Sequence, residues 1–257
     1  MGKWCAFPHA HEFALDEAEV RRRWAQLHGG DGEPLPKDEA VLAAWTLYHR
    51  GEFQAAVDAG LKAGDAGITV ANKATCIYAT YLEKKEKARL DLFLTVSERA
   101  AEQATRDPRN AAAWHLRGYA LGRYSQGISV ARALAQGFGG KVKESLERAI
   151  KLQPRHADAH IALGAFHAEV IDKVGPLIGG MTYGAKKETG LKLFQEALRL
   201  HPHSAIGLIE YANGLVMLEG ESRLAEATAL YERAAALEPL DAAQRLDVDL
   251  AQAELQD

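Results

Sequence analysis

The glycine-rich segment GPLIGGMTYGAK, residues 175–186, has the composition of a phosphate-binding loop, with four glycines and a lysine in twelve positions. A P-loop follows the pattern GxxxxGK[ST], so that backbone N–H groups surround the phosphates and the lysine reaches the outer ones. Gly179 and Gly184 have the required gap, but Ala185 stands at the lysine position and the lysine comes one residue late. The preceding residues, 160–174, have a helical pattern, whereas a P-loop follows a strand. We therefore interpret the segment as a long turn whose glycines permit tight bends, and not as a nucleotide site.

Three histidines at helical spacing raise the question of a metal site. His156 and His160 are four residues apart, and His167 lies two turns beyond His160. His160 and His167 fall at positions that pack inside a helix pair, whereas His156 lies in a turn two residues after Pro154. No Glu or Cys completes a set at zinc-ligand spacing. We therefore predict no metal site and no cofactor.

No set of residues in the sequence is a candidate for acid–base or nucleophilic catalysis. The sequence contains no nucleophile elbow and no Ser, His and Asp in an order that suggests a catalytic triad. Glu169 and Asp172 share one helix face, but Lys173 lies beside them, which is typical of a solvated charge cluster. We predict that the protein is not an enzyme and has no catalytic residues.

The composition is that of an ordinary folded protein. Of the 257 residues, 47% are hydrophobic and 26% are charged, which excludes wholesale disorder. The net charge of −4 gives no reason to expect nucleic-acid binding, which usually needs a basic excess. Cys5 and Cys76 form neither a disulfide framework nor a zinc pattern, as expected in a reducing cytosol.

The start of the chain and its apolar runs bear on localisation. Residues 1–10 lack a long apolar core behind a basic cap, so they do not predict a signal peptide. No apolar run approaches the roughly 18 residues that a spanning helix needs. We predict a cytoplasmic protein without a transmembrane segment, and export stays open if a leader has been removed.

A recurring helix pattern runs through the chain and must position any binding residues. Ala, Leu, Glu, Lys and Arg dominate, and few segments alternate as strands do, which indicates an all-α fold. Three segments share a Leu or aromatic residue, an Ala three residues later, then a Leu and a closing Pro: residues 144–154, 192–202 and 229–239. A weaker copy ends at Pro108, and residues 40–64 fit as an earlier repeat.

After each closing Pro, a new helix opens with a small residue about one turn in. Gly118, Gly164 and Ala212 hold these positions. A small residue lets two helices approach closely, and Pro stops the preceding helix. The pattern predicts about five helix pairs, preceded by a helix at residues 16–28 and capped by a helix at residues 241–255.

Two of the repeats are longer than the others. The prolines that close the repeats from Pro108 to Pro239 are 46, 48 and 37 residues apart. The surplus lies between the two helices of the third and fourth repeats, within residues 123–141 and 172–184. We predict that these insertions emerge side by side at one edge of the array and pack their apolar side chains together. A knob that binds a partner is the alternative interpretation.

These repeats resemble the tetratricopeptide repeat (TPR), whose pattern of W, L, G, Y, A, F, A and P spans 34 residues. Residues 110–240 further resemble the regulator-of-microtubule-dynamics family of TPR proteins, through AIKLQP before residue 155, AHIALGAFHAEV at residues 159–170, and a Gly-rich insertion before FQEALRLHP at residues 194–202. The resemblance implies an all-α, right-handed α-solenoid of helix hairpins with two lengthened repeats, and an adaptor-like role. The Ala, Arg and Gly content looks bacterial, so we do not carry over the microtubule role of eukaryotic members.

The resemblance also implies where a partner would bind. In TPR arrays the first helix of each repeat lines a concave groove. The phasing places aromatic, Ile and Met side chains there with one Arg, which suits an amphipathic helix or an extended peptide. The predicted groove residues are Trp45, Tyr48, His49, His115, Tyr119, Arg123, Ile161, Glu169, Ile209, Asn213 and Met217.

An N-terminal segment that covers the groove is the alternative. Four aromatic residues lie before residue 25 and also need burial, so this segment is able to pack on Trp45 and Tyr48. We divide the chain into an N-terminal segment (1–36), a TPR array (37–239) and a capping helix (240–257).

The leading functional prediction is a non-catalytic scaffold or adaptor that binds a protein or peptide in the concave groove. The alternative is a carrier that holds a small ligand or lipid in a pocket between the N-terminal segment and the two insertions. An open groove favours the scaffold, whereas a closed pocket lined by the insertions favours the carrier.

Overall fold

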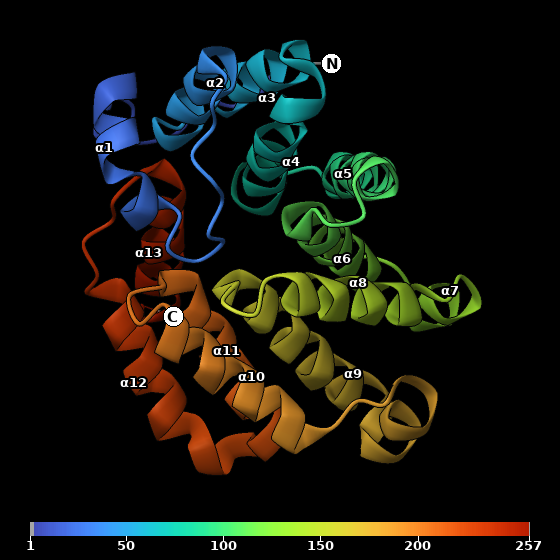
Figure 1. Ribbon diagram of the computed structural model, residues 1–257. Helices are drawn as coiled ribbons and strands as arrows, with labels where there is room; N and C mark the ends of the chain where they lie inside the picture. Colours follow the sequence, from blue (N-terminus) through green and yellow to red (C-terminus); the bar gives the residue numbers. More distant parts are fainter. Residues whose placement is uncertain (1–2, 257) are drawn as a thin grey trace.

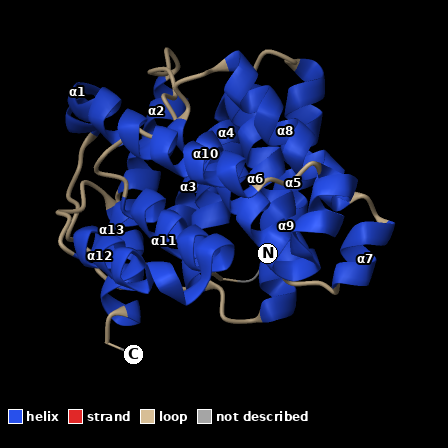
Figure 2. Cartoon of the chain, turned by 90° about the horizontal axis from the view of Figure 1, so that it is seen from below, coloured by secondary structure: helices blue, strands red, loops and turns tan. Residues whose placement is uncertain are grey.

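The computed structural model describes residues 3–256, and these form helices and connecting turns with no strand (Figures 1 and 2). This confirms the predicted all-α fold. The α-helices are α1 (Glu17–Leu27), α2 (Glu39–His49), α3 (Phe53–Lys62), α4 (Ile68–Ile77), α5 (Glu86–Arg106), α6 (Ala111–Gln126), α7 (Val130–Ala135), α8 (Phe138–Leu152), α9 (Ala157–Tyr183), α10 (Lys187–Leu200), α11 (Ala205–Glu219), α12 (Leu224–Ala235) and α13 (Ala242–Glu254).

Five helix hairpins form the solenoid. They are α2 with α3, α4 with α5, α6 with α8, α9 with α10, and α11 with α12. A π-helical turn at Tyr78–Leu82 extends α4, and short 3-10 turns at Gly64–Gly67 and Gly220–Arg223 precede α4 and α12. The stacked hairpins are the predicted solenoid, and α7 and the end of α9 are the lengthened parts.

Local sequence signals set the helix boundaries. The side chains of Asp16, Asp38, Asn110, Ser204 and Asp241 each accept a hydrogen bond from a backbone N–H in the first turn of the helix that follows. Such caps satisfy donors that have no partner inside the helix. The start of α1 and the position of α13 therefore agree with the helices predicted from the sequence.

Small residues bring the two helices of a hairpin together, as the repeat pattern predicted. A Cβ atom on Gly118 would lie 2.8 Å from Cγ of Leu146 in the partner helix. One on Gly164 would lie 3.0 Å from the Phe194 ring. Leu146 and Phe194 are both almost completely buried, so a larger residue at either glycine would push the helices apart.

The prediction of a long turn at residues 175–186 was wrong. Helix α9 continues to the kink at Gly175, whose φ of 81° and ψ of 160° are not helical, and a second helical segment then runs from Pro176 to Tyr183. Pro favours the first position of a helix because its fixed φ is already helical and its missing N–H is not needed there. Gly184, with φ of 64°, ends the segment by donating its backbone N–H to the Gly180 carbonyl at 3.0 Å.

The two insertions lie together at one edge of the molecule, as predicted (Figures 1 and 2). The ring of Tyr183 packs so closely over Gly139 that a Cβ on that glycine would lie 2.9 Å from its Cδ1 atom. Phe166 lies edge-on to the same ring at 6.4 Å between centroids. His167 holds the end of the second insertion, because its Nδ1 accepts the backbone N–H of Lys186 at 3.1 Å.

The solenoid curls until its two ends meet. One hydrophobic cluster combines Phe7 and Trp24 of the N-terminal segment with Trp45 of α2 and Leu246 of α13. Two polar contacts join the same parts: His9 Nε2 lies 2.6 Å from Asp249, and Arg23 donates to the Leu240 carbonyl at 3.4 Å. The N-terminal segment and the capping helix are thus packed into the array.

The connection between α1 and α2 crosses the concave side of the curl (Figure 1). Its Gly30 carbonyl accepts the backbone N–H of Asp158 at 3.1 Å, and its Asp31 carbonyl accepts Nε2 of Gln153 at 2.7 Å. Gln153 lies in the connection between α8 and α9, and Asp158 lies in the first turn of α9. These bonds tie the N-terminal part to the middle of the array and close the concave face on one side.

Candidate ligand-binding cavity

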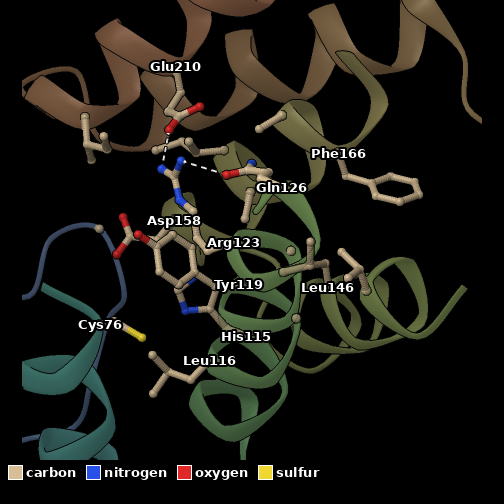
Figure 3. Close-up of a pocket in the computed structure, with 18 of the residues that line it drawn as sticks. Cys76, His115, Leu116, Tyr119, Arg123, Gln126, Leu146, Asp158, Phe166 and Glu210 are labelled. Carbon is tan, nitrogen blue, oxygen red and sulfur yellow. Dashed lines mark hydrogen bonds and ion pairs between the residues drawn. The ribbon is translucent and has the colours of Figure 1, made fainter. Parts of the chain in front are cut away.

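A cavity of about 350 Å³ occupies the concave side of the curled solenoid. Its lining comes from the α1–α2 connection and from α2, α4, α6, α8, α9, α11 and α13. Small-molecule sites in proteins generally have volumes of roughly 300–1,000 Å³. Figure 3 shows part of the lining, with Asp158 and Cys76 on one side, Leu146 and Phe166 on the other, and Tyr119 and His115 between them.

Buried paired charges form one side of the cavity. Lys73 of α4 forms an ion pair with Asp31, and its Nζ lies 3.8 Å from Asp158. Asp31 also lies 3.0 Å from Nδ1 of His28. Burial alone would lower the pKa of Lys73, but the charges of Asp31 and Asp158 raise it well above its usual value. Burial alone would raise the pKa of Asp31, but Lys73 and His28 hold it well below its usual value. The pair therefore stays ionised.

A second ion pair joins two helices across the cavity. Arg123 of α6 donates to Glu210 of α11 at 2.6 Å, and the same guanidinium lies 5.4 Å from the centre of the Tyr119 ring (Figure 3). Tyr119 is itself held by a hydroxyl contact of 3.2 Å with Thr80. Arg123 is thus already engaged by an acidic partner and an aromatic ring. It does not offer a free cation to an anionic ligand.

Neutral polar groups lie between these pairs. Tyr81, in the π-helical turn after α4, donates its hydroxyl hydrogen to Asp247 of α13. Burial raises the pKa of Asp247 to about 8, with the nearby Asp241 charge adding to the effect, so this carboxyl is mainly protonated near neutral pH. Burial lowers the pKa of His115 well below its usual value, which leaves its imidazole uncharged. Neither Asp247 nor His115 therefore places an unpaired charge in the cavity near neutral pH.

Apolar side chains form the other side of the cavity. Leu116 of α6, Leu146 of α8 and Phe166 of α9 line it, and the two insertions add further apolar groups. Because both insertions contribute, the cavity extends to the edge of the molecule where they emerge. The insertion residues in the lining that have no charged or amide side chain are Ser125, Ile128, Val130, Ala133, Leu134, Gly139, Val174 and Tyr183.

Most of the predicted groove residues line this cavity. They come from α2, α6 and α9, the first helices of three repeats, which is the face that the TPR pattern assigns to binding. Their side chains range from fully buried, as for His49, to partly exposed, as for Glu169. The predicted residues found in the lining are Tyr48, His49, His115, Tyr119, Arg123, Ile161 and Glu169.

Four predicted residues lie elsewhere. Trp45 is 1% exposed and packs edge-on against Trp24 at 5.9 Å, so the N-terminal segment covers it. Ile209 is in the hydrophobic core. Asn213 accepts a hydrogen bond of 2.7 Å from the hydroxyl of Tyr231 in α12, and Met217 is 37% exposed outside the cavity. The phasing of the repeats does not distinguish a groove position from one covered by another part of the chain.

The sequence analysis missed several cavity residues. Lys73 and Tyr81 belong to the second repeat. Its match to the repeat pattern is too weak to assign its residues to groove positions. Asp31 and Asp247 lie outside the repeats and reach the cavity only because the solenoid closes. Glu210 is in the first helix of the fifth repeat, one residue after Ile209. It is not at one of the repeat positions that we assigned to the groove. A phased second repeat would have predicted Lys73, but no local signal predicts the contributions of the two ends.

Two of the three histidines at helical spacing have structural roles. His156 caps α9 by accepting the Ala159 N–H at its Nδ1, and His167 accepts the N–H of Lys186. Burial lowers the pKa of His167 to about 4, which keeps the ring neutral for this bond. Within residues 3–256, no three His, Cys, Asp or Glu side chains are grouped as a metal ion would require. No helix in the same range combines the length and apolar character needed to cross a bilayer.

Comparison with solved structures shows the fold. A thermophilic TPR protein of Thermus thermophilus matches with a TM-score of 0.58 and 19% identity, covering 84% of this chain and 98% of that one. MamA matches with a TM-score of 0.41 and 15% identity over 86% of this chain and 99% of that one, a likeness too distant to carry an argument. No protein-family model and no curated protein sequence matches. The chain thus has the fold of a TPR protein, and proteins of this class in general use a concave surface to bind other proteins.

Proposed function

We propose that this chain is a non-catalytic binding protein that takes a small, uncharged amphiphile into its central cavity. The observation that carries the proposal is a cavity of about 350 Å³ on the concave face, which opens to solvent at the edge where the insertions emerge. The lining joins a polar side at Asp31, Lys73 and Asp247 to an apolar side at Leu146 and Phe166. This is the carrier function that the sequence left as the alternative to an open scaffold.

The α1–α2 connection across the concave face argues against an amphipathic helix as the ligand. Such a helix is roughly 10–12 Å in diameter with its side chains and needs an open groove. Here the anchor predicted at Trp45 is covered by Trp24, and the α1–α2 connection crosses the concave side through the bond from Asp158 to Gly30. A helical ligand would have to displace this connection.

The charges of the lining favour an uncharged ligand head. Lys73 and Arg123 are both paired with acidic residues, so binding an anion would require breaking an ion pair that is already desolvated. The protonated carboxyl of Asp247 and the neutral imidazole of His115 are suited to hydrogen bonds with hydroxyl or amide groups. The apolar side takes the hydrocarbon part by excluding water from it.

A short extended peptide is the second candidate, because part of the polar lining reaches the surface. Gln126 at the end of α6 is exposed, and it donates to Glu169, which is partly exposed. A chain end that hydrogen-bonds at this rim and places one apolar side chain in the cavity fits the observed volume. The general role of TPR proteins in binding other proteins agrees with this candidate.

Gly122 provides a direct test of the cavity. It lines the cavity, and a Cβ atom built on it would have only one neighbour within 4 Å, Cγ1 of Val142 at 3.8 Å. Gly122→Leu therefore adds a four-carbon side chain to open space, whereas Gly122→Ala changes the same helix position and fills little of it. The measurement is fluorescence titration with N-phenyl-1-naphthylamine, a small neutral apolar probe.

We expect the probe to bind the native protein, and Gly122→Leu to weaken binding at least about tenfold, because the added side chain occupies the same space. Gly122→Ala should bind the probe as the native protein does, and both variants should keep the native melting temperature within a few degrees. A native protein that does not bind the probe, or equal binding by all three proteins, would contradict the proposal. Competition by a peptide from a copurified partner would favour the second candidate.

A further inference from the structure

Within residues 3–256, five of the exposed large hydrophobic side chains lie in the two insertions, and they include the three most exposed ones. Met181 is 82% exposed, Leu177 is 74% exposed and Ile178 is 56% exposed, all within one short helical segment. Val130 and Leu134 of α7 are each 43% exposed, at the edge of the cavity that they also line. We refer to these five residues as the insertion tip. Contiguous apolar patches on a protein surface generally mark an interaction site.

The backbone holds the tip side chains outward on two short helices. Leu177 and Met181 are four residues apart, as are Val130 and Leu134, so each pair lies on one helix face. The kink at Gly175 turns the segment 176–183 away from the axis of the first part of α9. Both short helices lie at the edge of the molecule where the insertions come together (Figure 2).

The sequence segments that contain the tip are basic, and Glu144, Glu169 and Glu188 border them. Residues 127–143 and 172–187 contain six basic residues and one acidic residue, a net charge of +5. Because the whole chain has a net charge of −4, the remaining residues have a net charge of −9. The basic residues are Arg132, Lys141, Lys143, Lys173, Lys186 and Lys187.

In the described part of the chain, three of these six basic residues are already paired with glutamates outside the tip segments, and three are not. Lys143, Lys173 and Lys187 pair with Glu147, Glu169 and Glu219, which all lie outside those segments. Arg132, Lys141 and Lys186 are exposed. The tip therefore presents an apolar surface beside exposed basic side chains.

We propose that the insertion tip docks this protein on an anionic lipid bilayer. Short helices with apolar side chains on one face bury that face roughly 5–10 Å deep at the boundary between headgroups and acyl chains. Basic residues beside such a face are attracted to anionic headgroups, each contributing near the surface. An exposed apolar helix face beside basic side chains enters this boundary directly. The proposal is independent of which ligand the cavity binds.

The test is flotation with lipid vesicles. The native protein is mixed with vesicles of phosphatidylcholine and phosphatidylglycerol at a ratio of three to one, and with vesicles of phosphatidylcholine alone. We compare Met181→Asp with Leu224→Asp, a matched change at a residue of α12 that is 52% exposed and lies outside the tip. Both changes add one negative charge and remove one exposed apolar side chain.

A second pair of variants tests the charge. Arg132→Glu with Lys186→Glu reverses two exposed tip charges, and Lys62→Glu with Lys84→Glu makes the same change in charge at exposed positions far along the chain. The native protein should float with the anionic vesicles and less with the neutral ones, and added salt should reduce binding. Met181→Asp and the tip charge variant should each bind about tenfold or more weakly, whereas their controls should bind as the native protein does.

Three outcomes would overturn the proposal. The first is a native protein that does not float with anionic vesicles. The second is equal loss of binding in a tip variant and its matched control. The third is a native dimer in sedimentation velocity that Met181→Asp converts to a monomer without any vesicle binding, since a second copy of the chain would then cover the tip. Probe binding and melting temperature, measured on each variant, show whether the cavity and the fold are intact.

Discussion

Single residues around the cavity show how the fold controls charge. Lys73 and Asp31 remain ionised because each stabilises the charge of the other against burial. Asp247 has no cation so close, and Tyr81 donates to it as a neutral partner. Burial therefore keeps its carboxyl protonated at pH values at which an exposed carboxyl is charged.

The first prediction concerns Asp247→Asn and the pH dependence of stability. The pKa of Asp247 is raised from 3.8 to about 8, so the folded protein binds one proton more than the unfolded chain between these values. The stability contributed by this group is complete below about pH 4 and is lost as the pH rises through about 8. An amide has no such titration, and its oxygen still accepts the Tyr81 hydroxyl hydrogen.

Urea unfolding between pH 5 and pH 9 measures this effect. The native protein should lose stability as the pH rises, and Asp247→Asn should be less sensitive to pH over the same range. Glu33, whose pKa burial also raises to about 8, should leave the variant with part of the slope. Identical pH profiles for the two proteins would show that Asp247 is charged in the fold.

At the scale of elements, the insertions differ from ordinary turns because they contain helices. The sequence GPLIGGMTYG led us to predict a turn from its four glycines, yet only two of them, Gly175 and Gly184, have positive φ. The other two, Gly179 and Gly180, are helical, and their carbonyls accept the N–H bonds that end the segment. One glycine bends the chain and another ends the new helix.

The second prediction follows from the backbone at Gly175. Its φ of 81° with ψ of 160° is a conformation that only glycine adopts without strain, although no atom lies within 4 Å of an added Cβ. Gly175→Ala should therefore destabilise the fold by about 1–3 kcal/mol through strain alone. It should also change the exposure of the 176–183 segment to limited proteolysis.

Gly140→Ala is the matched control for this prediction. Gly140 lies in the first turn of α8, has helical backbone and also has open space around an added Cβ. Alanine should stabilise the protein there by about 0.5–1 kcal/mol, since it restricts the unfolded chain more than glycine does. Denaturant unfolding of both variants checks the two signs. A neutral effect of Gly175→Ala would mean that the kink relaxes into a continuous helix.

At the scale of the whole molecule, the N-terminal segment and α13 close the solenoid. His49 of α2 and Asp241, the cap of α13, are both almost fully buried and lie 2.6 Å apart. Residues of the N-terminal segment, of α2 and of α13 therefore meet in one core at the point of closure, although they lie far apart in the sequence. We propose that these three parts unfold as a single cooperative unit.

The third prediction tests that unit with Trp24→Ala. Trp24 is 6% exposed, stacks on His28 at 4.1 Å between ring centroids, and donates its ring N–H to the Glu33 carbonyl at 2.7 Å. Its removal should destabilise the whole protein by about 3–5 kcal/mol, as large-to-small changes in a core generally do. The fluorescence and circular dichroism transitions should still coincide, at a lower denaturant concentration.

Trp114→Ala is the control, because Trp114 lies on α6 away from the closure and is only half-buried. It should cost about 1 kcal/mol or less. If Trp24→Ala instead produced a first transition that affects only the N-terminal segment, the proposal of one cooperative unit would fail. The solenoid would then behave as separate repeats with an attached arm.

The sequence by itself determined the solenoid. Helix periodicity, the capping residues, and the small residues at Gly118 and Gly164 act over one or two turns or between adjacent helices, so they can be recognised along the chain. Because these signals are local, they also predicted which helices the two insertions lie between. It also predicted that Tyr119 and Arg123 lie on the concave face, because helix position alone sets that direction.

Only the tertiary structure decided which residues cover the concave face and which line its cavity. The burial of Trp45 under Trp24, and the arrival of Asp247 opposite Tyr81, depend on contacts between residues far apart in the sequence. Small rotations between successive hairpins add up along the solenoid, and their sum determines whether the ends meet. No local pattern encodes that sum. The cavity and the insertion tip are therefore properties of the whole curl. The repeat helices that build them are predicted by their own sequence, whereas α7 and the helical segment 176–183 are not.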